Sequence, residues 1–476
     1  MEDKNFEMNR PVNPRRKKRS QMQIFKEAYL PVIIAALALV LIVVFIIGSI
    51  SRAVQKSKAE KDASIAASSS LATEQEKLEQ RIQALIAEAE VLAASYDYEA
   101  AIALLNTFDG DLTVHTQIND QIIVYERAMK SMVAWNDPSQ IPNLSFQILL
   151  ADADRGFAHE TYGSAINRNF VTTEEFSKIL QQLYANGYIL VDFDDFIEVN
   201  TTPDGATSYT AKTLYLPSGK KPVMLTQTNV NYNYYLIDSD GDRLADAKGT
   251  GIASKLLWNG STFTNEMVDA AGNTVTGNFD LVPILENFIA QNPDFSYRGA
   301  RATLALTGYN GLFGYRTHPK AATYFGDAAY QQAIQDATVL ANALRSTGYK
   351  LAFYTYENVP YGDYSLSQIQ TDLNDWTNEA VPILGNLDMI VFAQNSDISN
   401  EAVYTGEKYE ALRNAGFRYY VGFSNGGTPW TTITNDYVRQ GRIMVSGSNM
   451  AHHADWFAAM FDAATVLDAS RGNVPN

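Results

Sequence analysis

Histidine and cysteine, the side chains that most often bind transition metals or attack a substrate, are scarce in this sequence. There is no cysteine, which excludes disulfide bonds, thiolate metal sites and cysteine nucleophiles. Among five histidines, one adjacent pair, His452 and His453, precedes Asp455. Neighbouring side chains on a helix or strand point in different directions, so this pair is not expected to share a metal. We interpret it as part of a C-terminal helix, and the lone His318 as a structural residue.

Alternating aspartates form a second candidate site, in the run Asp238-Ser-Asp240-Gly-Asp242. Such carboxylates are typical of calcium loops, where their oxygens converge on a hard cation. The sixth position of such a loop requires glycine, but here it is Arg243, and no glutamate occupies the twelfth position. The pattern therefore favours a solvated turn, with calcium binding as the alternative.

Composition excludes other classes of function. The chain has 476 residues, of which 46% are apolar and 19% charged, enough for several folding units with a sizeable core. Acidic residues outnumber basic ones, 53 to 37, and the net charge of −16 argues against nucleic acid as the main partner. The sequence contains no phosphate-binding glycine loop.

A transmembrane helix is predicted at residues 28–50. Its centre, Leu30 to Ile47, is an 18-residue run without a charged or polar side chain, and about 20 apolar residues span a bilayer. The basic tail, residues 1–27, carries eight Lys and Arg against four Asp and Glu, which places it in the cytoplasm and the rest of the chain outside. We therefore expect a single-pass protein of the cell membrane, and a cysteine-free exported domain suits a Gram-positive surface.

Residues 51–137 are expected to form a linker and an α-helical stalk. Leucine and isoleucine recur at spacings of three and four between Leu78 and Leu92. Asp97 is the expected N-cap of a second helix, and a third helix is expected from Val114 to Trp135. A stalk of this kind would lift the main domain off the membrane.

Residues 138–476 alternate between strand-like and helical segments, which predicts parallel pairing in an α/β sheet or barrel. The expected strands are Ser145–Leu150, Tyr188–Asp192, Val223–Thr226, Ala302–Leu306, Leu351–Tyr354, Met389–Ala393 and Tyr419–Phe423. The expected helices are Thr173–Asn186, Leu281–Ala290, Tyr330–Thr347, Ser367–Ala380 and Glu401–Asn414. Residues from about 200 to 277 are irregular and are expected to be an insertion. The acidic cluster Asp192, Asp194 and Asp195 is expected where a strand leads into a helix.

The order of these segments resembles the polysaccharide deacetylase (NodB homology) family. KKPVMLTQTNV resembles the family's first catalytic strand, RATLALTGYNGLFGYRT a following strand, and QDATVLANALRSTGYKLAFYTYEN the helix and strand of its second motif. The resemblance covers about residues 145–445 and implies a distorted (β/α) barrel with its reactive groups on loops at the C-terminal ends of the strands.

The family implies a divalent metal such as zinc, held by one Asp and two His, with a second Asp as the base that activates water. In this sequence Thr228 stands at the position of the base and Asn229 at that of the metal-binding Asp. Tyr354 and Asn358 replace the two histidines. All four metal and base positions are thus substituted, so the resemblance predicts no metal site and a pseudoenzyme.

A barrel without its metal can still bind a glycan in its groove. Tyrosine is abundant, with 27 residues, and aromatic faces with a polar edge suit sugar rings. The glycan-binding candidates are Tyr354, Tyr356, Trp376, Trp430 and Arg316, because they lie at or near segments that match the family's active-site strands.

Three functions remain open from the sequence. The first is a membrane-anchored, non-catalytic deacetylase-like protein that binds cell-wall or surface polysaccharide. The second is an active metal-dependent carbohydrate deacetylase with a non-standard site. The third is an envelope scaffold that binds other proteins through the barrel and the stalk.

Overall fold

The computed structural model describes residues 69–476, with side chains from residue 74. The predicted basic tail and the predicted transmembrane helix at residues 28–50 lie outside the described residues. From residue 69 onward, no helix is both long and apolar enough to cross a membrane. The chain divides into two compact units, residues 1–83 and 84–476, and helix α3 (Ser69–Ala94) runs from the first into the second. The following description concerns the second unit.

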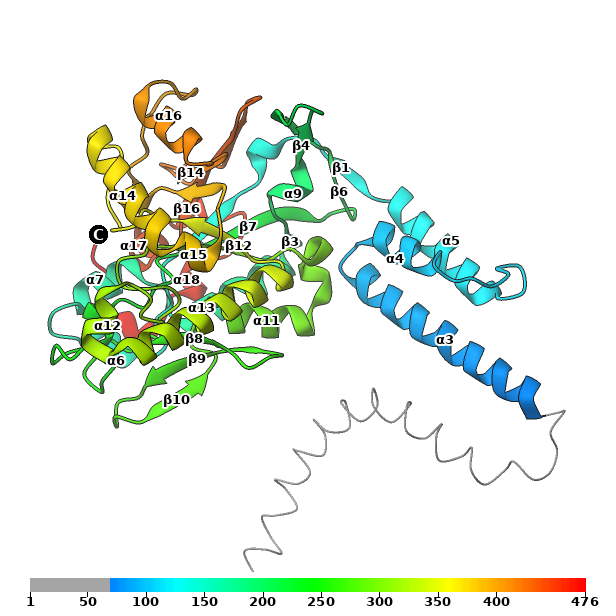
Figure 1. The fold of residues 1–476 in the computed structure, drawn as a ribbon, viewed down its shortest axis with the longest axis horizontal. Coiled ribbons are helices and arrows are strands. Elements are labelled where there is room, and N and C mark those ends of the chain that lie inside the picture. The colour runs from blue at the N-terminus through cyan, green and yellow to red at the C-terminus, as the bar shows by residue number, and fades with distance from the viewer. Residues whose placement is uncertain (1–68) are drawn as a thin grey trace, which may run out of the picture. The chain divides into compact units, whose positions relative to one another are not determined.

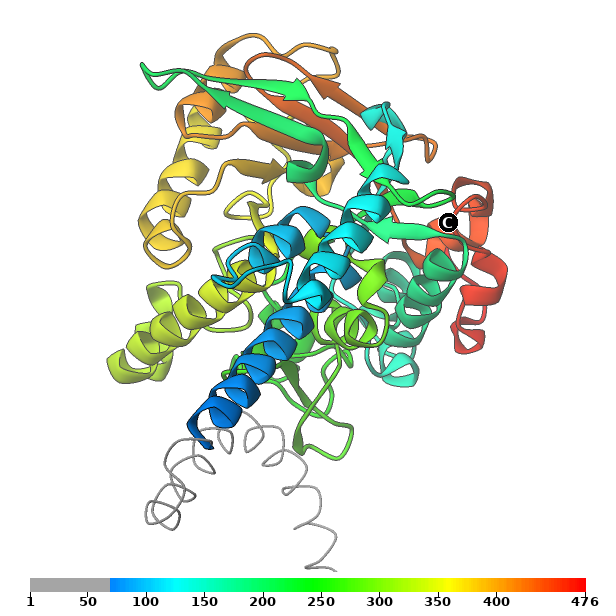
Figure 2. The ribbon, with the colours of Figure 1, turned by 90° about the vertical axis from the view of Figure 1, so that its right-hand side faces the viewer.

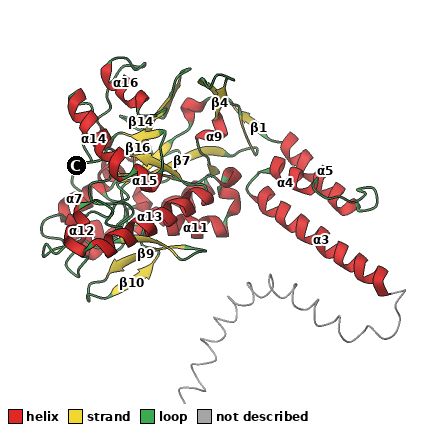
Figure 3. Cartoon of the chain, viewed as in Figure 1, coloured by secondary structure: helices red, strands yellow, loops and turns green. Residues whose placement is uncertain are grey.

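Seven parallel strands close into a barrel, which confirms the predicted (β/α) barrel, and helices surround these strands (Figures 1 and 3). The strands follow one another around the barrel in chain order, and the ring closes where the last strand pairs with the first. These strands are β2 (Asn143–Phe146), β7 (Lys221–Thr228), β11 (Thr303–Leu306), β12 (Lys350–Phe353), β13 (Met389–Val391), β14 (Tyr419–Phe423) and β16 (Val438–Met444).

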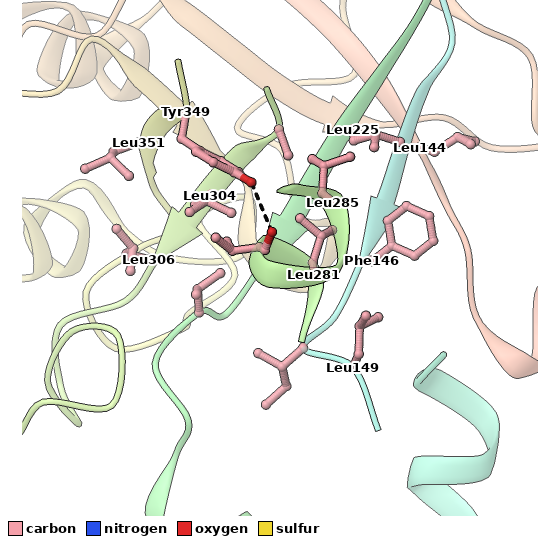
Figure 4. Close-up of a cluster of buried hydrophobic side chains, with 14 of the residues drawn as sticks. Leu144, Phe146, Leu149, Leu225, Leu281, Leu285, Leu304, Leu306, Tyr349 and Leu351 are labelled. Carbon is pink, nitrogen blue, oxygen red and sulfur yellow. Dashed lines mark hydrogen bonds between the residues drawn. The ribbon is translucent and has the colours of Figure 1, made fainter. Parts of the chain in front are cut away.

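The two-residue period of the strands divides their side chains between the barrel interior and the surrounding helices. In β7, Met224 packs in an inner cluster, whereas Val223 and Leu225 pack outward. Figure 4 shows part of this outer layer, where Leu225 and Leu304 meet Leu281 and Leu285 of a covering helix. The buried Tyr349 hydroxyl donates a hydrogen bond at 3.3 Å to the carbonyl oxygen of Val282 on the same helix.

Helices connect the strands and cover the barrel. They are α6 (Ala153–Phe157), α7 (Gly163–Asn169), α8 (Thr173–Ala185), α9 (Phe193–Phe196), α10 (Tyr234–Ile237), α11 (Leu281–Gln291), α12 (Lys320–Phe325), α13 (Asp327–Thr347), α14 (Leu366–Glu379), α15 (Val381–Leu384), α16 (Glu407–Asn414), α17 (Gly447–His452) and α18 (Ala463–Val466). Capping boxes start three of them, at Thr172 with Glu175, at Asp192 with Asp195 and at Ser365 with Gln368. The five predicted helices are present with shifted ends, most clearly α16, which begins six residues after the predicted Glu401.

Short strands decorate the barrel. Strand β3 (Tyr188–Leu190) pairs with β7, and β15 (Trp430–Ile433) pairs antiparallel with β16. The others are β1 (Val133–Trp135), β4 (Ile197–Thr201), β5 (Thr207–Ala211), β6 (Leu214–Leu216), β8 (Lys255–Trp258), β9 (Phe263–Val268) and β10 (Thr274–Gly277). In Figure 2 the β4–β5 hairpin lies beside the strands near β15, where the Tyr209 N–H donates to the Asn435 carbonyl oxygen at 3.1 Å. Residues 200–277, which were predicted to be an irregular insertion, therefore contain the barrel strand β7, with ordered hairpins before and after it in the sequence.

Helices α4 (Tyr98–Leu105) and α5 (Thr116–Lys130) form a hairpin next to the barrel. The predicted N-cap is confirmed, because Asp97 Oδ1 accepts a hydrogen bond from the Ala100 N–H at 3.2 Å. The prediction that the third helix reaches Trp135 is wrong. The helix ends at Lys130, and the next residues form β1, which pairs antiparallel with β6, so a long-range strand pairing overrides the local helical pattern.

The predicted C-terminal helix through His452 and His453 is also different in the structure. Helix α17 ends at His452, and residues Ala454–Trp456 form a 3₁₀ turn. The His453 ring stacks on Trp456, with 4.4 Å between ring centroids, and His452 Nε2 lies 3.0 Å from the carbonyl oxygen of Val474. The two histidines thus have separate partners.

Candidate functional site

The barrel mouth, meaning the loops that follow the C-terminal ends of the barrel strands, concentrates backbone strain. Ten non-glycine residues in the described chain have positive φ angles, a conformation that side chains disfavour. Seven of them lie in these loops: Asn229, Tyr232, Phe313, Thr355, Asn358, Gln394 and Asn395. Strained residues of this kind cluster at ligand-binding and active sites, so the mouth is a candidate functional site.

The two positions that correspond to the family's base and metal-binding Asp are buried at the end of β7. The Thr228 hydroxyl donates to the carbonyl oxygen of Phe146 at 3.2 Å. Asn229 has a φ of 63° and its Oδ1 accepts a hydrogen bond from Asn233 Nδ2 at 3.1 Å. Neither side chain carries a charge, and each already has a protein partner.

The two positions of the family's histidines lie after β12. Tyr354 is 3% exposed, and its ring centroid lies 5.9 Å from the Arg442 guanidinium. The carbonyl oxygen of Asn358 accepts a hydrogen bond from Gln394 Nε2 at 2.6 Å. Together the four positions offer one hydroxyl, one phenol and two amides next to a cation. This donor set does not fit the divalent metal that the family resemblance implies.

Carboxylates that could converge on a cation occur away from these positions. Among the described residues, Asp238, Asp240 and Asp246 form such a group, so the fold joins Asp246 rather than Asp242 to the predicted loop. Their oxygens are occupied by the loop itself: Asp238 Oδ1 accepts from the N–H groups of Asp240 and Gly241 at 3.0 and 2.7 Å. This bonding pattern is that of an Asx turn. The calcium interpretation gains no further support from it.

A guanidinium group fills the inside of the barrel just below the mouth. Arg442 lies four residues after the inward-facing Val438 on β16, so it points into the barrel, and it is fully buried. Its Nη atoms donate to the carbonyl oxygens of Phe392, Val421 and Gly422 at 2.9 to 3.3 Å. No carboxylate of the described residues forms an ion pair with it, and burial lowers its pKa.

Arg442 also contributes to an unusual set of unpaired polar atoms. Its Nη2 donates to Asn395 Oδ1 at 3.1 Å, but its Nε has no hydrogen-bond partner. Two more buried oxygens on the inner face, Ser145 Oγ and Thr307 Oγ1, have no partner among the described residues. Buried polar groups are normally satisfied, so three exceptions in one barrel interior mark a region that is not built for stability alone.

A second arginine without a carboxylate partner lies in the loop after β11. Arg316 donates to the carbonyl oxygens of Asn310 and Tyr232 at 3.1 and 3.0 Å, and its guanidinium lies 4.0 Å from the Tyr234 ring centroid. Burial lowers the pKa of Arg316 to about 10. The Tyr234 hydroxyl lies 3.2 Å from His318 Nε2.

The surroundings of His318 show that this part of the mouth is cationic. Burial, together with the charges of Arg316, Lys320 and Arg243, lowers the pKa of His318 to about 4. Arg243 has a φ of 69°, lies 3.8 Å from the Tyr324 ring centroid, and forms no ion pair with a described residue. Cations gathered without matching carboxylates favour an anionic ligand.

Tyrosine rings line a groove beside this cationic region. The groove, which we call the tyrosine groove, has a volume of about 1030 Å³ and is lined by Tyr162, Tyr234, Tyr235, Arg243 and residues around them. Tyr235 is 44% exposed and its ring lies 5.8 Å from that of Tyr162. Burial raises the pKa of Tyr235, and Tyr162 and Tyr354 add to the rise.

A buried carboxylate positions the loop after β12. Asp372 of α14 accepts hydrogen bonds from the N–H groups of Tyr356 and Glu357 at 2.7 and 2.9 Å, and from the Tyr361 hydroxyl at 2.7 Å. This explains how Thr355 and Asn358 are held at positive φ. It also buries Tyr356, which is 6% exposed and whose hydroxyl donates to Glu379.

Two of the predicted glycan-binding aromatics lie away from the mouth opening. Trp376 is 3% exposed and packs on Phe353 in the core, with 4.7 Å between ring centroids. Trp430 pairs with Gly441 on the outside of the barrel and lies 5.5 Å from the Arg439 guanidinium. We leave both tryptophans out of the candidate site. Of the residues predicted from the sequence, the site retains Arg316 and the buried Tyr354.

Sequence reasoning missed Arg442, Arg243, Tyr162 and Tyr235. For Arg442 a signal exists in the segment VRQGRIM, where the inward residues Val438, Gln440 and Arg442 alternate with outward residues such as Ile443. Two of these inward residues are polar, so the segment does not stand out as an apolar strand. The tyrosines lie in loops without periodicity, and their proximity depends on the fold. No local pattern could have brought Tyr162 next to Tyr235.

Comparison with known proteins gives little beyond the fold. No protein-family model matches the chain, and no curated protein sequence matches it. Among solved structures, the deacetylase PplD of Streptococcus pyogenes, in complex with acetate, is similar at 13% sequence identity with a TM-score of 0.33. The similarity covers 67% of this chain and 97% of that chain. At this distance neither an activity nor site residues transfer from one protein to the other.

Proposed function

We propose that this chain is a polysaccharide deacetylase-like (NodB-type) barrel protein that binds an anionic glycan in the tyrosine groove and does not hydrolyse acetyl groups. The observation that carries the proposal is the tyrosine groove, where the exposed Tyr235 lies with Tyr162, Tyr234 and Arg243, and Arg316 stacks on the Tyr234 ring at 4.0 Å; neither arginine forms an ion pair with a described residue. Tyrosine faces suit the apolar faces of sugar rings. The arginines would pair with carboxylate or sulfate groups on the glycan.

The absence of catalysis follows from the four substituted positions. A metal-assisted hydrolysis needs a Lewis acid and a base at the mouth. Thr228, Asn229, Tyr354 and Asn358 provide neither, and the positive Arg442 beside Tyr354 opposes a divalent cation there. We further propose, from the sequence, that residues 28–50 anchor the chain in the cell membrane with the barrel outside.

The test measures binding and hydrolysis on the same preparation of the full chain, held in lipid nanodiscs. The binding probes are a hexasaccharide that alternates glucuronate with N-acetylglucosamine, and the neutral N-acetylchitohexaose, both measured by calorimetry. We expect the acidic oligosaccharide to bind at least tenfold more tightly. Acetate release is followed in parallel with added zinc, and no release is expected. Acetate release above the blank would overturn the non-catalytic part of the proposal.

Two variants locate the binding. Arg316→Gln removes the cation and is expected to weaken binding of the acidic hexasaccharide at least tenfold. The matched control is Arg418→Gln, because Arg418 also donates to carbonyl oxygens, those of Arg413 and Phe417 at 2.8 Å, but precedes β14 at the opposite end of the barrel. Tyr235→Ala is expected to weaken both oligosaccharides. Equal binding of the acidic and neutral probes, or equal loss in the control, would reject the anionic-glycan assignment.

A further inference from the structure

A second cavity lies at the opposite end of the barrel, between the α4–α5 hairpin and the barrel base. Its volume is about 520 Å³, within the range of small-molecule sites. The hairpin supplies Tyr96, Tyr98, Met129 and Met132 to its lining, and the barrel base supplies residues that follow β3 and precede β11. We call this cavity the base pocket.

The base pocket is held open by direct bonds between its two walls. The Arg298 N–H donates to the Ser95 carbonyl oxygen at 2.7 Å, and Arg298 Nη2 donates to Glu99 Oε2 at 2.9 Å. On the next edge, β1 pairs with β6, with Ala134 opposite Tyr215. These bonds tie the hairpin to the barrel on two sides of the pocket, so it is preformed.

Backbone strain marks this pocket as it marks the mouth. Apart from Arg243 and the seven mouth residues named above, two non-glycine residues of the described chain have positive φ: Tyr96 at 65° and Arg298 at 50°. Both line the base pocket. Because neither is glycine or asparagine, each needs surrounding structure to hold it, which is typical of ligand sites.

Two polar groups in the pocket lack a full set of partners. Arg298 Nε is buried without a hydrogen-bond partner among the described residues. Asp195 Oδ2 accepts a hydrogen bond from the Asp192 N–H at 2.9 Å, and its other oxygen has none within the described chain. Burial and the nearby Asp192 raise the pKa of Asp195 to about 8, so at neutral pH its carboxyl is largely protonated and can donate. The pocket therefore presents two donors that need an acceptor.

The walls indicate what carries that acceptor. Tyr96, Tyr98, Tyr215 and Tyr297 line the pocket together with two methionines. Aromatic rings and thioethers both favour contact with another aromatic ring, through edge or offset stacking and through sulfur–ring contacts. The Arg298 charge is already balanced by Glu99, so the acceptor does not have to be an anion.

We propose that the base pocket binds a planar aromatic ring that carries a carbonyl or carboxylate oxygen, with the ring between tyrosine and methionine side chains and the oxygen at Arg298 Nε and Asp195. This site is independent of the tyrosine groove. It would give the protein a second ligand, bound where the hairpin joins the barrel.

The test uses the full chain in lipid nanodiscs, with empty nanodiscs as the blank. The probes are 2-naphthoate and 2-naphthamide, which share the ring and differ in charge, and cyclohexanecarboxylate, which keeps the charge but lacks the aromatic ring. We expect at least one naphthyl probe to bind one site per chain with a Kd below about 1 mM, and at least tenfold more tightly than cyclohexanecarboxylate. Failure of both naphthyl probes, or equal binding of cyclohexanecarboxylate, would overturn the proposal.

Variants show whether the probe occupies the base pocket. Arg298→Lys keeps a cation for Glu99 but removes the Nε donor, and it is expected to weaken binding at least fivefold. The control is Arg301→Lys, because Arg301 is close in sequence but pairs with Glu286 at 2.7 Å outside the pocket. If Arg298→Lys does not fold, Tyr98→Leu keeps an apolar side chain and removes one ring, with the same expected loss. Unchanged binding in both pocket variants would place the probe elsewhere and reject the site.

Discussion

The two ends of the barrel differ in their charged groups. At the mouth two arginines, Arg442 and Arg316, donate to carbonyl oxygens and form no ion pair with a described carboxylate, and the buried Asp372 accepts hydrogen bonds from the loop after β12. At the base the buried groups are aspartates: Asp192 and Asp195 are crowded together, and burial raises the pKa of both. Lys350 bridges Asp192 and Asp194 there.

This difference bears on the proposal that the chain does not hydrolyse acetyl groups at the mouth. A divalent metal needs carboxylates or imidazoles at the C-terminal ends of the strands. Here the four positions that the resemblance aligns with the metal and base residues hold a hydroxyl, a phenol and two amides beside Arg442, and the nearby Asp372 already accepts hydrogen bonds from loop N–H groups. The mouth is therefore suited to bind anions, whereas the base is suited to donate hydrogen bonds from a protonated carboxyl.

The largest expected effect concerns the buried cation of the mouth. Arg442→Ala leaves the carbonyl oxygens of Phe392, Val421 and Gly422 without their donor in a closed interior, so we expect it to lower the unfolding free energy by about 3–5 kcal/mol. At the base, Lys350→Ala removes a partly exposed ion pair and is expected to cost about 0–1 kcal/mol. Denaturant titration measures both. Equal costs would remove the contrast between the two ends.

The two ends are next expected to respond to pH with opposite signs, and His318 reports the mouth. Its pKa is lowered to about 4, so the folded state binds the proton less well than the unfolded state. Its contribution to stability is present above about pH 6.5 and is lost as pH falls toward 4. The unfolding free energy of the wild type is expected to fall by about 1–3 kcal/mol between pH 7 and pH 4.5 because of this group, and His318→Gln is expected to abolish that fall. Unfolding measurements at the two pH values check this. The exposed His452→Gln should leave the loss unchanged.

Asp195 reports the base, with the opposite sign. Its pKa is raised to about 8, so the folded state binds the proton more tightly than the unfolded state. Stability is then highest below about pH 4 and is lost as pH rises toward 8. Asp195→Asn is expected to be more stable than the wild type by about 1–2 kcal/mol at pH 8 and similar to it at pH 4. A variant with the wild-type pH dependence would show that Asp195 is ionised at neutral pH, and the exposed Asp240→Asn serves as the control.

The smallest expected effect tests the strain at the mouth. Gln394 has a φ of 52° and an exposed side chain. Gln394→Gly relieves the strain, which is expected to raise the unfolding free energy by up to about 1 kcal/mol. The same substitution removes the hydrogen bond from Gln394 to Asn358, which offsets part of this gain. Gln394→Ala loses that bond without relief, so it should be less stable than the glycine variant. The reverse order, in thermal unfolding of the two variants, would mean that this loop is not strained.

Much of the barrel could be predicted because its outward strand faces are apolar. Strands such as Tyr419–Phe423 and the segment around Val223 stand out as short apolar runs between helices. Strand β16 was missed because its inward residues, Gln440 and Arg442, are polar and mask the alternation. The same polar residues are what distinguish this mouth, so the strand that was hardest to predict contributes most to the site.

The glycan-binding candidates show the same limit. Arg316 and Tyr354 were identified through their position after barrel strands, and both lie at the mouth. Trp376 was chosen by the same reasoning, but its helical spacing places it against Phe353 in the core. An aromatic residue near a site in sequence can face either the ligand or the core, and only packing decides which.

The sequence by itself determined which side chains are available for chemistry and that the chain folds as a (β/α) barrel. The lack of cysteine, the few histidines and the neutral residues Thr228, Asn229, Tyr354 and Asn358 are readable without coordinates, and so is the alternation that builds a barrel. Tertiary structure alone decided where the charges lie relative to the barrel axis. It joined Tyr162 to Tyr235 and joined Tyr96 to Arg298, because side chains far apart in sequence become neighbours only when the strands close and the hairpin docks.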